Sequence, residues 1–318
     1  MPVWIVYILM LLGGVVVLGG GGEALVRGAG RLARTLGMSS LVVGLTVVAF
    51  GTSAPEAAVT IFAASQGAGD LAVGNVVGSN IANLLLILGF AAVVKPLGIS
   101  RSLLRLDGPV MILASVVFLV LAARNHVILR WEGGLFVAGL VVYTLVTYQV
   151  GRRSAPRDDE ASPTGVAGKA WYNLVLVAGG IGGLVLGAKW IVDGASGIAA
   201  LLGVPPHIIG LTIVAIGTSL PELATVVAAA RQSQPDIAIG NVVGSNIFNI
   251  LFVTGCASTV RPLAVPSEIV HTDGPLMVLV SLLAYLAIWT GQKVVRWEGV
   301  VLLAGYVAYL TWAGSRAL

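Results

Sequence analysis

The sequence repeats itself once, at a constant offset of 166 residues. The segment 44–56 (GLTVVAFGTSAPE) returns at 210–222 with 10 of 13 residues identical, and the segment 74–83 (GNVVGSNIAN) returns at 240–249 with 9 of 10 identical. Shorter matches later in each half keep the same register without a gap. A duplication of this kind predicts a fold made of two structurally related halves.

Apolar segments of about 20 residues recur through both halves. Hydrophobic residues make up 57% of the 318-residue chain and charged residues only 10%, whereas a soluble domain carries about 25% charged residues. Each apolar segment is long enough to cross a hydrocarbon layer of roughly 30 Å. The sequence therefore predicts an all-α polytopic membrane protein with ten transmembrane helices, at 3–34, 39–66, 70–92, 106–123 and 131–149 in the first half, and at 168–200, 205–232, 236–258, 272–289 and 297–315 in the second half.

Five crossings per half is an odd number, so the second half is expected to cross the membrane upside down relative to the first. With the N-terminus outside, 13 of the 18 Lys and Arg residues fall on the cytoplasmic side, as the positive-inside rule requires. We expect a first five-helix repeat at 1–150, a cytoplasmic linker at 151–168 and an inverted repeat at 169–318. Both termini are then extracytoplasmic, in the cell (plasma or inner) membrane. Inverted repeats of this kind are typical of secondary transporters.

Other features exclude function classes. The basic residues are scattered singly, which argues against nucleic-acid binding, and the single cysteine, Cys256, excludes an internal disulfide. The sequence has no nucleophile elbow and no HExxH motif, so we predict no enzyme, no catalytic residues, no cofactor and no obligate protein partner. Asp107 and Asp273 precede Gly-Pro and are predicted helix N-caps. The three histidines have no mirrored partners and receive no role; they are His126, His207 and His271.

Two acidic residues, Glu56 and Glu222, lie deep inside apolar segments, and the repeat pairs them. A charged side chain at the bilayer centre costs about 3 kcal/mol or more. No Lys or Arg lies near either glutamate in the same segment, so protons or bound cations must compensate the charge. The sequence therefore predicts a cation site shared by the two repeats.

The residues before each glutamate favour a metal cation. Each Glu follows Gly-Thr-Ser-X-Pro, and proline removes one helical amide and breaks the helix there. The expected oxygen ligands are hydroxyl groups and two backbone carbonyls, from Thr52, Ser53, Thr218 and Ser219, and from Ala49 and Ala215. Hard oxygen ligands suit Ca²⁺ and Na⁺, and the lack of His and Cys argues against Zn²⁺.

The second repeated motif adds polar side chains four residues apart, on one face of a helix. We expect direct coordination by four of them, Ser79 and Asn83 in the first half and Ser245 and Asn249 in the second. Four other asparagines are assigned helix-breaking or packing roles instead: Asn75, Asn80, Asn241 and Asn246.

On these paired Gly-Thr-Ser-X-Pro-Glu and Gly-Ser-Asn-Ile-X-Asn motifs, the chain resembles the cation/Ca²⁺ exchanger superfamily, specifically its Na⁺/Ca²⁺ exchanger branch with two alpha-repeats. The resemblance implies a ten-helix inverted-repeat fold and alternating access at one central site. It also implies that Glu56 and Glu222 hold Ca²⁺ and share in Na⁺ binding. In that scheme the hydroxyl and carbonyl groups complete the Ca²⁺ and flanking Na⁺ sites, with Ser79 and Ser245 at the flanking sites and Asn83 and Asn249 in the middle.

One departure from the family affects the charge of the site. Several relatives, including the K⁺-dependent exchangers, carry Asp at the position of Asn249, so this site offers only two formal negative charges. This argues against K⁺ co-transport. One Ca²⁺ would neutralise the site and three Na⁺ would leave it at +1, so exchange is expected to be electrogenic if three Na⁺ bind. The short linker holds no counterpart of the regulatory domain of animal exchangers.

The predicted function is therefore secondary active exchange of Na⁺ for Ca²⁺, with these two ions and the lipid bilayer as partners. A Ca²⁺/H⁺ antiporter that uses the same two glutamates is the alternative, and a passive cation channel is less favoured. The hydroxyl-rich motif favours Na⁺ as the counter-ion.

Overall fold

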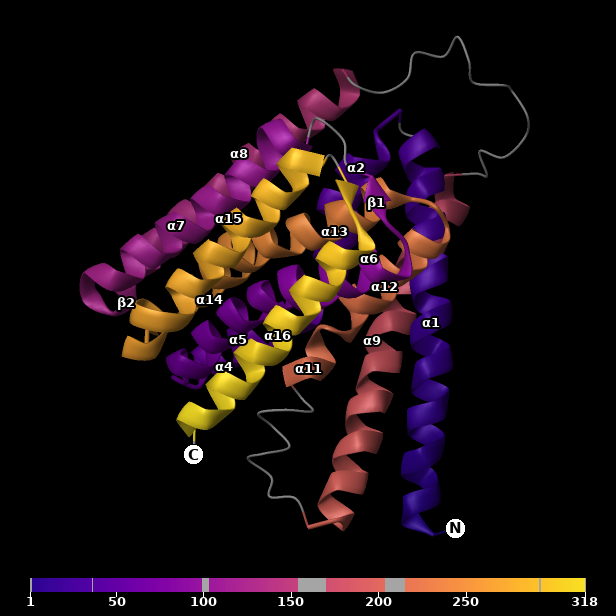
Figure 1. Cartoon of the computed structure of the whole chain (residues 1–318), viewed down its shortest axis with the longest axis horizontal. Coiled ribbons are helices and arrows are strands. Elements are labelled where there is room, and N and C mark those ends of the chain that lie inside the picture. Colours follow the sequence, from indigo (N-terminus) through magenta and orange to yellow (C-terminus); the bar gives the residue numbers. More distant parts are fainter. Residues whose placement is uncertain are drawn as a thin grey trace.

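The computed structural model describes residues 2–35, 37–98, 103–153, 170–203, 215–291 and 293–317, and nearly all of them are helical (Figure 1). Short π-helical turns, labelled η, interrupt several of the longer helices. The first half contains α1 (Val3–Thr35), α2 (Ser40–Val43), η1 (Gly44–Val48), α3 (Ala49–Thr52), α4 (Ala54–Ser65), α5 (Gly69–Ala82), η2 (Asn83–Ile87), α6 (Leu88–Val94), β1 (Leu97–Gly98), η3 (Leu103–Asp107), α7 (Gly108–Asn125), β2 (Val127–Ile128) and α8 (Arg130–Arg153).

The second half repeats this order. It contains α9 (Ala170–Leu201), α11 (Ala215–Thr218), α12 (Leu220–Arg231), α13 (Pro235–Phe248), η6 (Asn249–Thr254), α14 (Gly255–Val260), β3 (Leu263–Ala264), η7 (Ile269–Asp273), α15 (Gly274–Gly291), β4 (Lys293–Val294) and α16 (Arg296–Ala317). The predicted span 205–232 is described only from residue 215, and the predicted linker 151–168 only as far as Arg153, where α8 ends.

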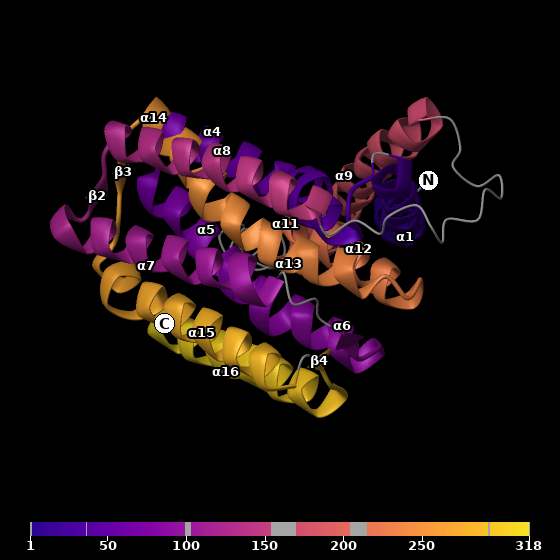
Figure 2. The same ribbon diagram turned by 90° about the horizontal axis from the view of Figure 1, so that it is seen from above.

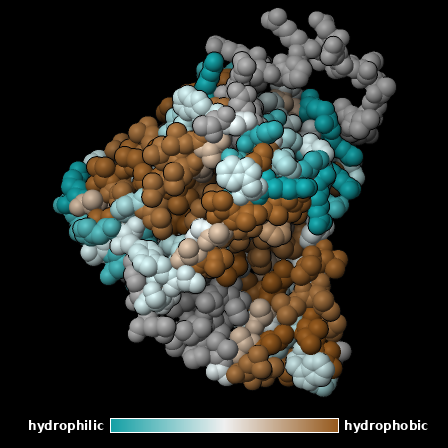
Figure 3. All heavy atoms as spheres, viewed as in Figure 1, coloured by the Kyte–Doolittle hydropathy of each residue, from teal (hydrophilic) through white to brown (hydrophobic). Residues whose placement is uncertain are grey.

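The helices confirm a multi-pass membrane protein. Seven of the described helices are long and apolar enough to cross a membrane, and the number rises to eight if α2–α3 and α4 form one span bent by 48°. The ten-span count therefore stays a prediction. The two further expected spans are α12, which has only 12 residues, and α16, in which Tyr and Trp side chains and Glu298 dilute the apolar character. Hydrophobic atoms form a continuous area on the face shown in Figure 3, with polar atoms gathered toward its margins.

The ends of the helices show how the halves are oriented. In Figure 1 the N- and C-termini lie toward the same end of the molecule, the terminal end, whereas α1 and α8 finish at the opposite end, the linker end, where α9 begins. The helices α1 and α9 lie side by side at one edge of the helical body (Figure 2). They run in opposite directions, because Gly14 packs on Ile191, Gly21 on Leu184 and Gly28 on Val177.

Glycine lets α1 and α9 approach closely. Glycines recur every seven residues on both helices, at 14, 21 and 28 on α1 and at 180, 187 and 194 on α9. A Cβ atom at Gly21 would lie 2.7 Å from the backbone nitrogen of Leu184, which is too close for any side chain. Small residues at such a spacing are the usual means by which membrane helices pack backbone to backbone.

Two small antiparallel sheets tie the repeats together. Strand β1 pairs with β4, and β2 pairs with β3, so each sheet joins one strand from each half. The two pairings are related by the 166-residue offset, since β1 corresponds to β3 and β2 to β4. The long, mostly buried helical segments α5–α6 and α13–α14 fill the centre of the body, and they carry the second repeated motif.

Candidate cation-binding site

The two glutamates lie where the helices break, as the proline predicts. Ser53 separates α3 from α4 and has a non-helical backbone (φ −81°, ψ 5°), and Ser219 does the same between α11 and α12 (φ −89°, ψ 2°). Glu56 and Glu222 therefore stand in the first turn of α4 and α12, where the positive end of the helix dipole stabilises a carboxylate.

Both carboxylates are buried in the protein, each at 2% exposure. Each accepts a hydrogen bond from the serine beside the other glutamate's helix break, so the two carboxylates lie in one site. None of the ion pairs among the described residues includes either of them. Two like charges thus face each other in a buried site with no basic partner, which agrees with the sequence-based expectation that a cation compensates them.

Hydroxyl groups cross between the repeats to reach the carboxylates. Ser53 Oγ donates to Glu222 Oε1 at 3.1 Å, and Ser219 Oγ donates to Glu56 Oε1 at 3.4 Å. The two bonds are related by the 166-residue offset, so each repeat holds the glutamate of the other.

Asparagines from α5 and α13 form a second symmetric layer. Asn83 Nδ2 donates to Asn246 Oδ1, and Asn249 Nδ2 donates to Asn80 Oδ1, both at 3.1 Å. These two bonds use the amide nitrogens of Asn83 and Asn249, and the side-chain carbonyl oxygens of the same two residues take no part in them. Asn80 and Asn246 in turn donate to the sulfur atoms of Met277 and Met111 at 3.6 Å.

Among the buried side-chain oxygen atoms that have no hydrogen-bond partner within the described residues, four lie at this centre. They are Glu56 Oε2, Glu222 Oε2, Asn83 Oδ1 and Asn249 Oδ1, and they form two pairs related by the repeat. A buried acceptor without a donor costs free energy unless another partner supplies positive charge. Carboxylate and amide oxygens without donors are the ligands that Ca²⁺ and Na⁺ take in proteins.

The remaining predicted ligands lie around this centre. Thr52 is fully buried and donates to Asn241 Oδ1 at 2.9 Å, and Ser245 donates to the same oxygen at 3.5 Å. Ser79 is buried on α5, one turn before Asn83. Thr218 ends α11 and is half-buried. Ala215 begins α11.

The backbone carbonyl at Ala49 is already engaged. It accepts the amide of Ser53 at 3.0 Å and the hydroxyl of Thr52 at 3.3 Å. The amide that Pro55 lacks would have bonded four residues back, to the carbonyl of Gly51. In the second repeat, Pro221 stands in the same relation to Gly217. The proline therefore takes one amide donor away from each glycine carbonyl, and a cation at Ala49 would share an oxygen that already accepts the Ser53 amide.

The structure gives two of the asparagines a more definite role than the sequence did. Asn80 and Asn246 were expected to pack or to break helices. They do pack, and their side-chain oxygens also accept the amide nitrogens of Asn249 and Asn83, the two asparagines predicted as ligands. The sequence marks these two asparagines only through the repeat, because Asn80 and Asn246 are each other's counterpart in the two halves.

One acidic residue differs from its predicted role. Asp107 makes no side-chain cap at the start of α7; its buried Oδ1 instead accepts the Tyr143 hydroxyl at 3.0 Å. The π-helix η3 continues directly into α7, so α7 has no free helix start for Asp107 to cap. The carboxylate instead links α7 to α8 through its bond with Tyr143.

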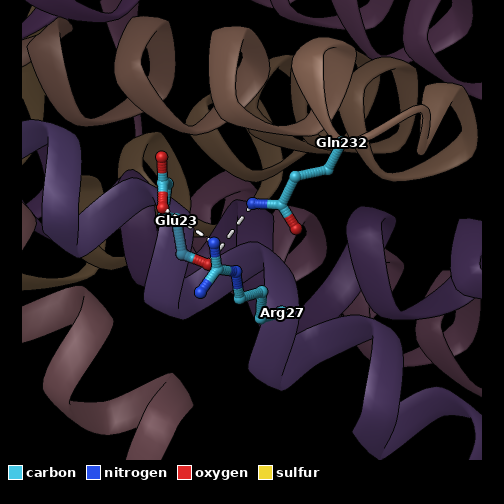
Figure 4. Close-up of polar contacts among 3 residues, drawn as sticks. All are labelled: Glu23, Arg27 and Gln232. Carbon is cyan, nitrogen blue, oxygen red and sulfur yellow. Dashed lines mark hydrogen bonds and ion pairs between the residues drawn. The ribbon is translucent and has the colours of Figure 1, made fainter.

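The helix α1 covers the linker side of the site. Gly22 lies against the backbone of Ala224 and Thr225, two and three residues beyond Glu222. Next to it, Gln232 Nε2 donates to the carbonyl oxygen of Glu23 at 3.5 Å, while Arg27 pairs with the Glu23 carboxylate at 3.0 Å (Figure 4). These contacts pack α1 against α12 on this side of the site.

These features define an integral membrane protein whose two halves meet at a pair of buried carboxylates among neutral oxygen groups. Within the part of the chain that the structure describes, no group of three or more His, Cys, Asp and Glu side chains is placed to hold a metal ion. The site thus relies on hydroxyl, amide and carbonyl oxygens beside its two charges.

The model of the sodium/calcium exchanger protein family matches residues 6–149 and 172–314, once in each half. The chain belongs to this family. The sodium/calcium exchanger MaX1 of Methanosarcina acetivorans is 38% identical over 95% of this chain and 97% of its own length. The putative antiporter CaxA of Alkalimonas amylolytica is 36% identical, over 95% and 96%. The family confirms the resemblance drawn from the motifs, and its members are exchangers rather than enzymes.

The fold is also similar to a solved structure. The sodium-calcium exchanger NCX_Mj, soaked with 10 mM Na⁺ and zero Ca²⁺, matches with a TM-score of 0.86 and 30% identity, over 97% of this chain and 99% of that chain. The likeness therefore extends over both halves.

Proposed function

We propose that the protein is a secondary active antiporter that exchanges Na⁺ for Ca²⁺, with ten transmembrane helices in two inverted repeats. The observation that carries the proposal is the set of four buried, donor-free oxygens of Glu56, Glu222, Asn83 and Asn249. The site has two formal negative charges and no basic residue paired with them. Membership of the sodium/calcium exchanger family supports the choice of ions.

In this proposal the carboxylate and amide oxygens hold Ca²⁺ at the centre. Ser53 and Ser219 fix one oxygen of each carboxylate and leave the other for the ion. Thr52, Ser79, Thr218 and Ser245, with the carbonyls of Ala49 and Ala215, supply oxygens for Na⁺ on either side. One Ca²⁺ neutralises the two charges, whereas three Na⁺ leave the site at +1, so exchange at that stoichiometry is electrogenic.

The same repeat sets the proposed topology. With 13 of 18 basic residues on the cytoplasmic side, both termini lie outside the cell membrane and the linker lies inside. The first repeat then spans 1–150 and the second 169–318. Helices α1 and α9, which pack on each other at one edge of the body, are the proposed moving element for alternating access.

The alternative coupling ion is H⁺. Each carboxylate accepts a bond from a neutral serine hydroxyl rather than from a basic side chain, so protonation would relieve the repulsion between the glutamates as a cation does. The two couplings differ in their driving force, which a flux assay measures directly.

The test is ⁴⁵Ca²⁺ uptake into proteoliposomes that contain the purified protein. We expect uptake to require internal Na⁺ and to persist when the pH gradient is collapsed. Uptake that follows the pH gradient without Na⁺ would establish Ca²⁺/H⁺ exchange, and uptake indifferent to both gradients would establish a channel. Valinomycin-clamped potentials then report whether charge moves with each cycle.

Replacing Glu56→Gln removes one of the two site charges with little change of shape. We expect Na⁺-dependent uptake to fall by roughly 100-fold or more, because ligand charge sets Ca²⁺ affinity. Thermal stability should be kept or raised, since an unpaired buried charge has gone. The matched control is Glu268→Gln, an exposed glutamate, which should exchange normally. Full activity in Glu56→Gln would contradict the site assignment.

A further inference from the structure

We infer that His126 and His271 form a binding site for a divalent transition-metal ion of the zinc class, separate from the glutamate site. Their imidazole rings lie 5.9 Å apart between centroids, tilted by 34°, and both side chains are exposed. One histidine comes from each half of the chain. The offset does not mirror them, since Arg105 and Gln292 occupy the equivalent positions, so only the fold brings them together.

The spacing of the rings fits a shared ion. A metal bound by two imidazoles has metal–nitrogen distances of about 2.0–2.1 Å, which places the ring centroids about 5–6 Å apart for ordinary coordination angles. Imidazole suits zinc, nickel and copper, whereas Ca²⁺ and Na⁺ prefer oxygen. The pair is therefore chemically distinct from the site of Glu56 and Glu222.

The second shell of His271 is already in place. Its Nδ1 lies 2.9 Å from the carbonyl oxygen of Ser267 and 3.1 Å from the Ser267 hydroxyl. Donation from Nδ1 to the carbonyl leaves Nε2 with its lone pair free, which is how metal-binding histidines are commonly oriented.

The backbone of His126 is fixed on both sides. It ends α7 in the left-handed conformation (φ 53°), with its amide donating to Ala122 O at 2.9 Å. Its own carbonyl oxygen accepts the amide of Val265 at 2.8 Å. This places the His126 ring at the β2–β3 pairing, beside the first turn of η7 that carries His271. Holding a ligand residue rigidly reduces the cost of binding.

The surrounding charges permit a cation. Arg124, two residues before His126, pairs with the fully buried Glu132 at 2.6 Å, so its charge is compensated. Glu268 is exposed and lies three residues before His271 on the same turn. No third His, Cys, Asp or Glu ligand joins the pair within the described ranges, so water completes the coordination shell.

A bound ion would connect the two repeats. It would join the end of α7 to η7, beside the β2–β3 sheet that already links the halves. Figures 1 and 2 both place this sheet on the side of the body away from α1 and α9. The ion would therefore stabilise the helical body rather than block the moving helices.

The experiment measures Zn²⁺ binding to the purified full-length protein in detergent, with Ca²⁺ in excess to occupy the glutamates. Calorimetry should show one Zn²⁺ per chain, and saturating Zn²⁺ should raise the thermal midpoint by about 2–4 °C, because an ion that binds only the folded state stabilises it. His126→Gln and His271→Gln should each abolish both signals. A crystal soaked in Zn²⁺ should show anomalous density between the two rings.

The sequence offers a matched control in His207→Gln, since His207 is the remaining histidine and lies outside the described residues. This variant should bind Zn²⁺ as the parent does. Equal Zn²⁺ binding in His126→Gln and in the parent would overturn the inference, as would Zn²⁺ binding that is lost in Glu56→Gln but kept in His271→Gln. Neither result depends on whether the protein exchanges Na⁺ for Ca²⁺.

Discussion

The two repeats are alike at the cation site and unlike at the helices that flank it. At the site, the bond from Ser53 to Glu222 has its counterpart in the bond from Ser219 to Glu56. Beside the site, α1 packs along α12, but within the described residues α9 makes no comparable packing on α4, the equivalent pair.

The difference is visible in side-chain exposure. Val59 and Phe62 on α4 are 36% and 68% exposed, whereas the equivalent Thr225 and Ala228 on α12 are 0% and 6% exposed. On α1 the residue Leu25 is fully buried, while its equivalent on α9, Ile191, is only half-buried. The packed interface, α1 on α12, thus lies toward the linker end, and the equivalent face of α4 is exposed.

Nearly identical motifs in two different packings support the alternating access proposed above. If α1 and α9 moved so that α9 packed on α4, the repeats would exchange roles and the opposite side of the site would close. Such an exchange between two discrete packings is how inverted repeats alternate access. The site itself need not change, which agrees with its symmetry.

The largest effect should come from fixing the packed interface. Cysteines at Glu23 and Gln232, in a background with Cys256→Ala, lie across the contact drawn in Figure 4. Joining them with a short bifunctional thiol reagent should abolish Na⁺-dependent ⁴⁵Ca²⁺ uptake, and a reducible reagent should restore it on reduction. Exchange that continues with the cross-link complete would show that α1 need not leave α12.

The repeat supplies the control for this cross-link. The positions equivalent to Glu23 and Gln232 are Lys189 and Gln66. Cysteines there should react slowly with the same reagent in the resting protein and faster during exchange. If the two cysteine pairs reacted equally at rest, α1 on α12 and α9 on α4 would not differ in packing as the structure shows.

A smaller effect should test the symmetry of the site. Ser53→Ala and Ser219→Ala each remove one hydrogen bond to a carboxylate, worth about 1.5 kcal/mol or more, so apparent Ca²⁺ affinity should fall by about tenfold. Because the two bonds are equivalent, the losses should agree within about threefold. The measurement is the Ca²⁺ dependence of exchange in proteoliposomes. A loss confined to one serine would show that the repeats bind the ion unequally.

Much of the fold, and the grouping of most residues at the site centre, could be predicted from the sequence. Burying Glu56 and Glu222 among apolar residues costs free energy, and a bound cation is one of the few ways to offset that cost. The repeat then identifies the neighbouring residues that belong to the same site. The breaks at Ser53 and Ser219 followed from Pro55 and Pro221 in the same way, because the missing amide acts locally.

What the sequence missed depends on distance across the fold. Asn83 and Asn246 come from different helices, so the bond that directs the Asn83 carbonyl oxygen is not visible in either motif. The meeting of His126 with His271 has the same origin. The unequal packing of α1 and α9 was also unpredictable, because near-identical motifs encode both packings and the choice between them is a matter of conformation.

The smallest expected effect comes from adding a single methyl group to the interface between α1 and α12. A Cβ atom at Gly22 would lie 3.0 Å from the carbonyl oxygen of Ala224, so Gly22→Ala should weaken the packing of α1 on α12 by about 1 kcal/mol, the lower end of the usual cost of overpacking. The state in which α1 packs on α12 then loses population by about fivefold, which should appear as faster labelling of a cysteine at Gln232. The equivalent α9 position is already alanine, Ala188, and Ala188→Gly should leave that labelling unchanged because α9 does not contact α12 there in the same way. If Gly22→Ala labels no faster than the parent, the close contact between Gly22 and Ala224 does not hold α1 on α12.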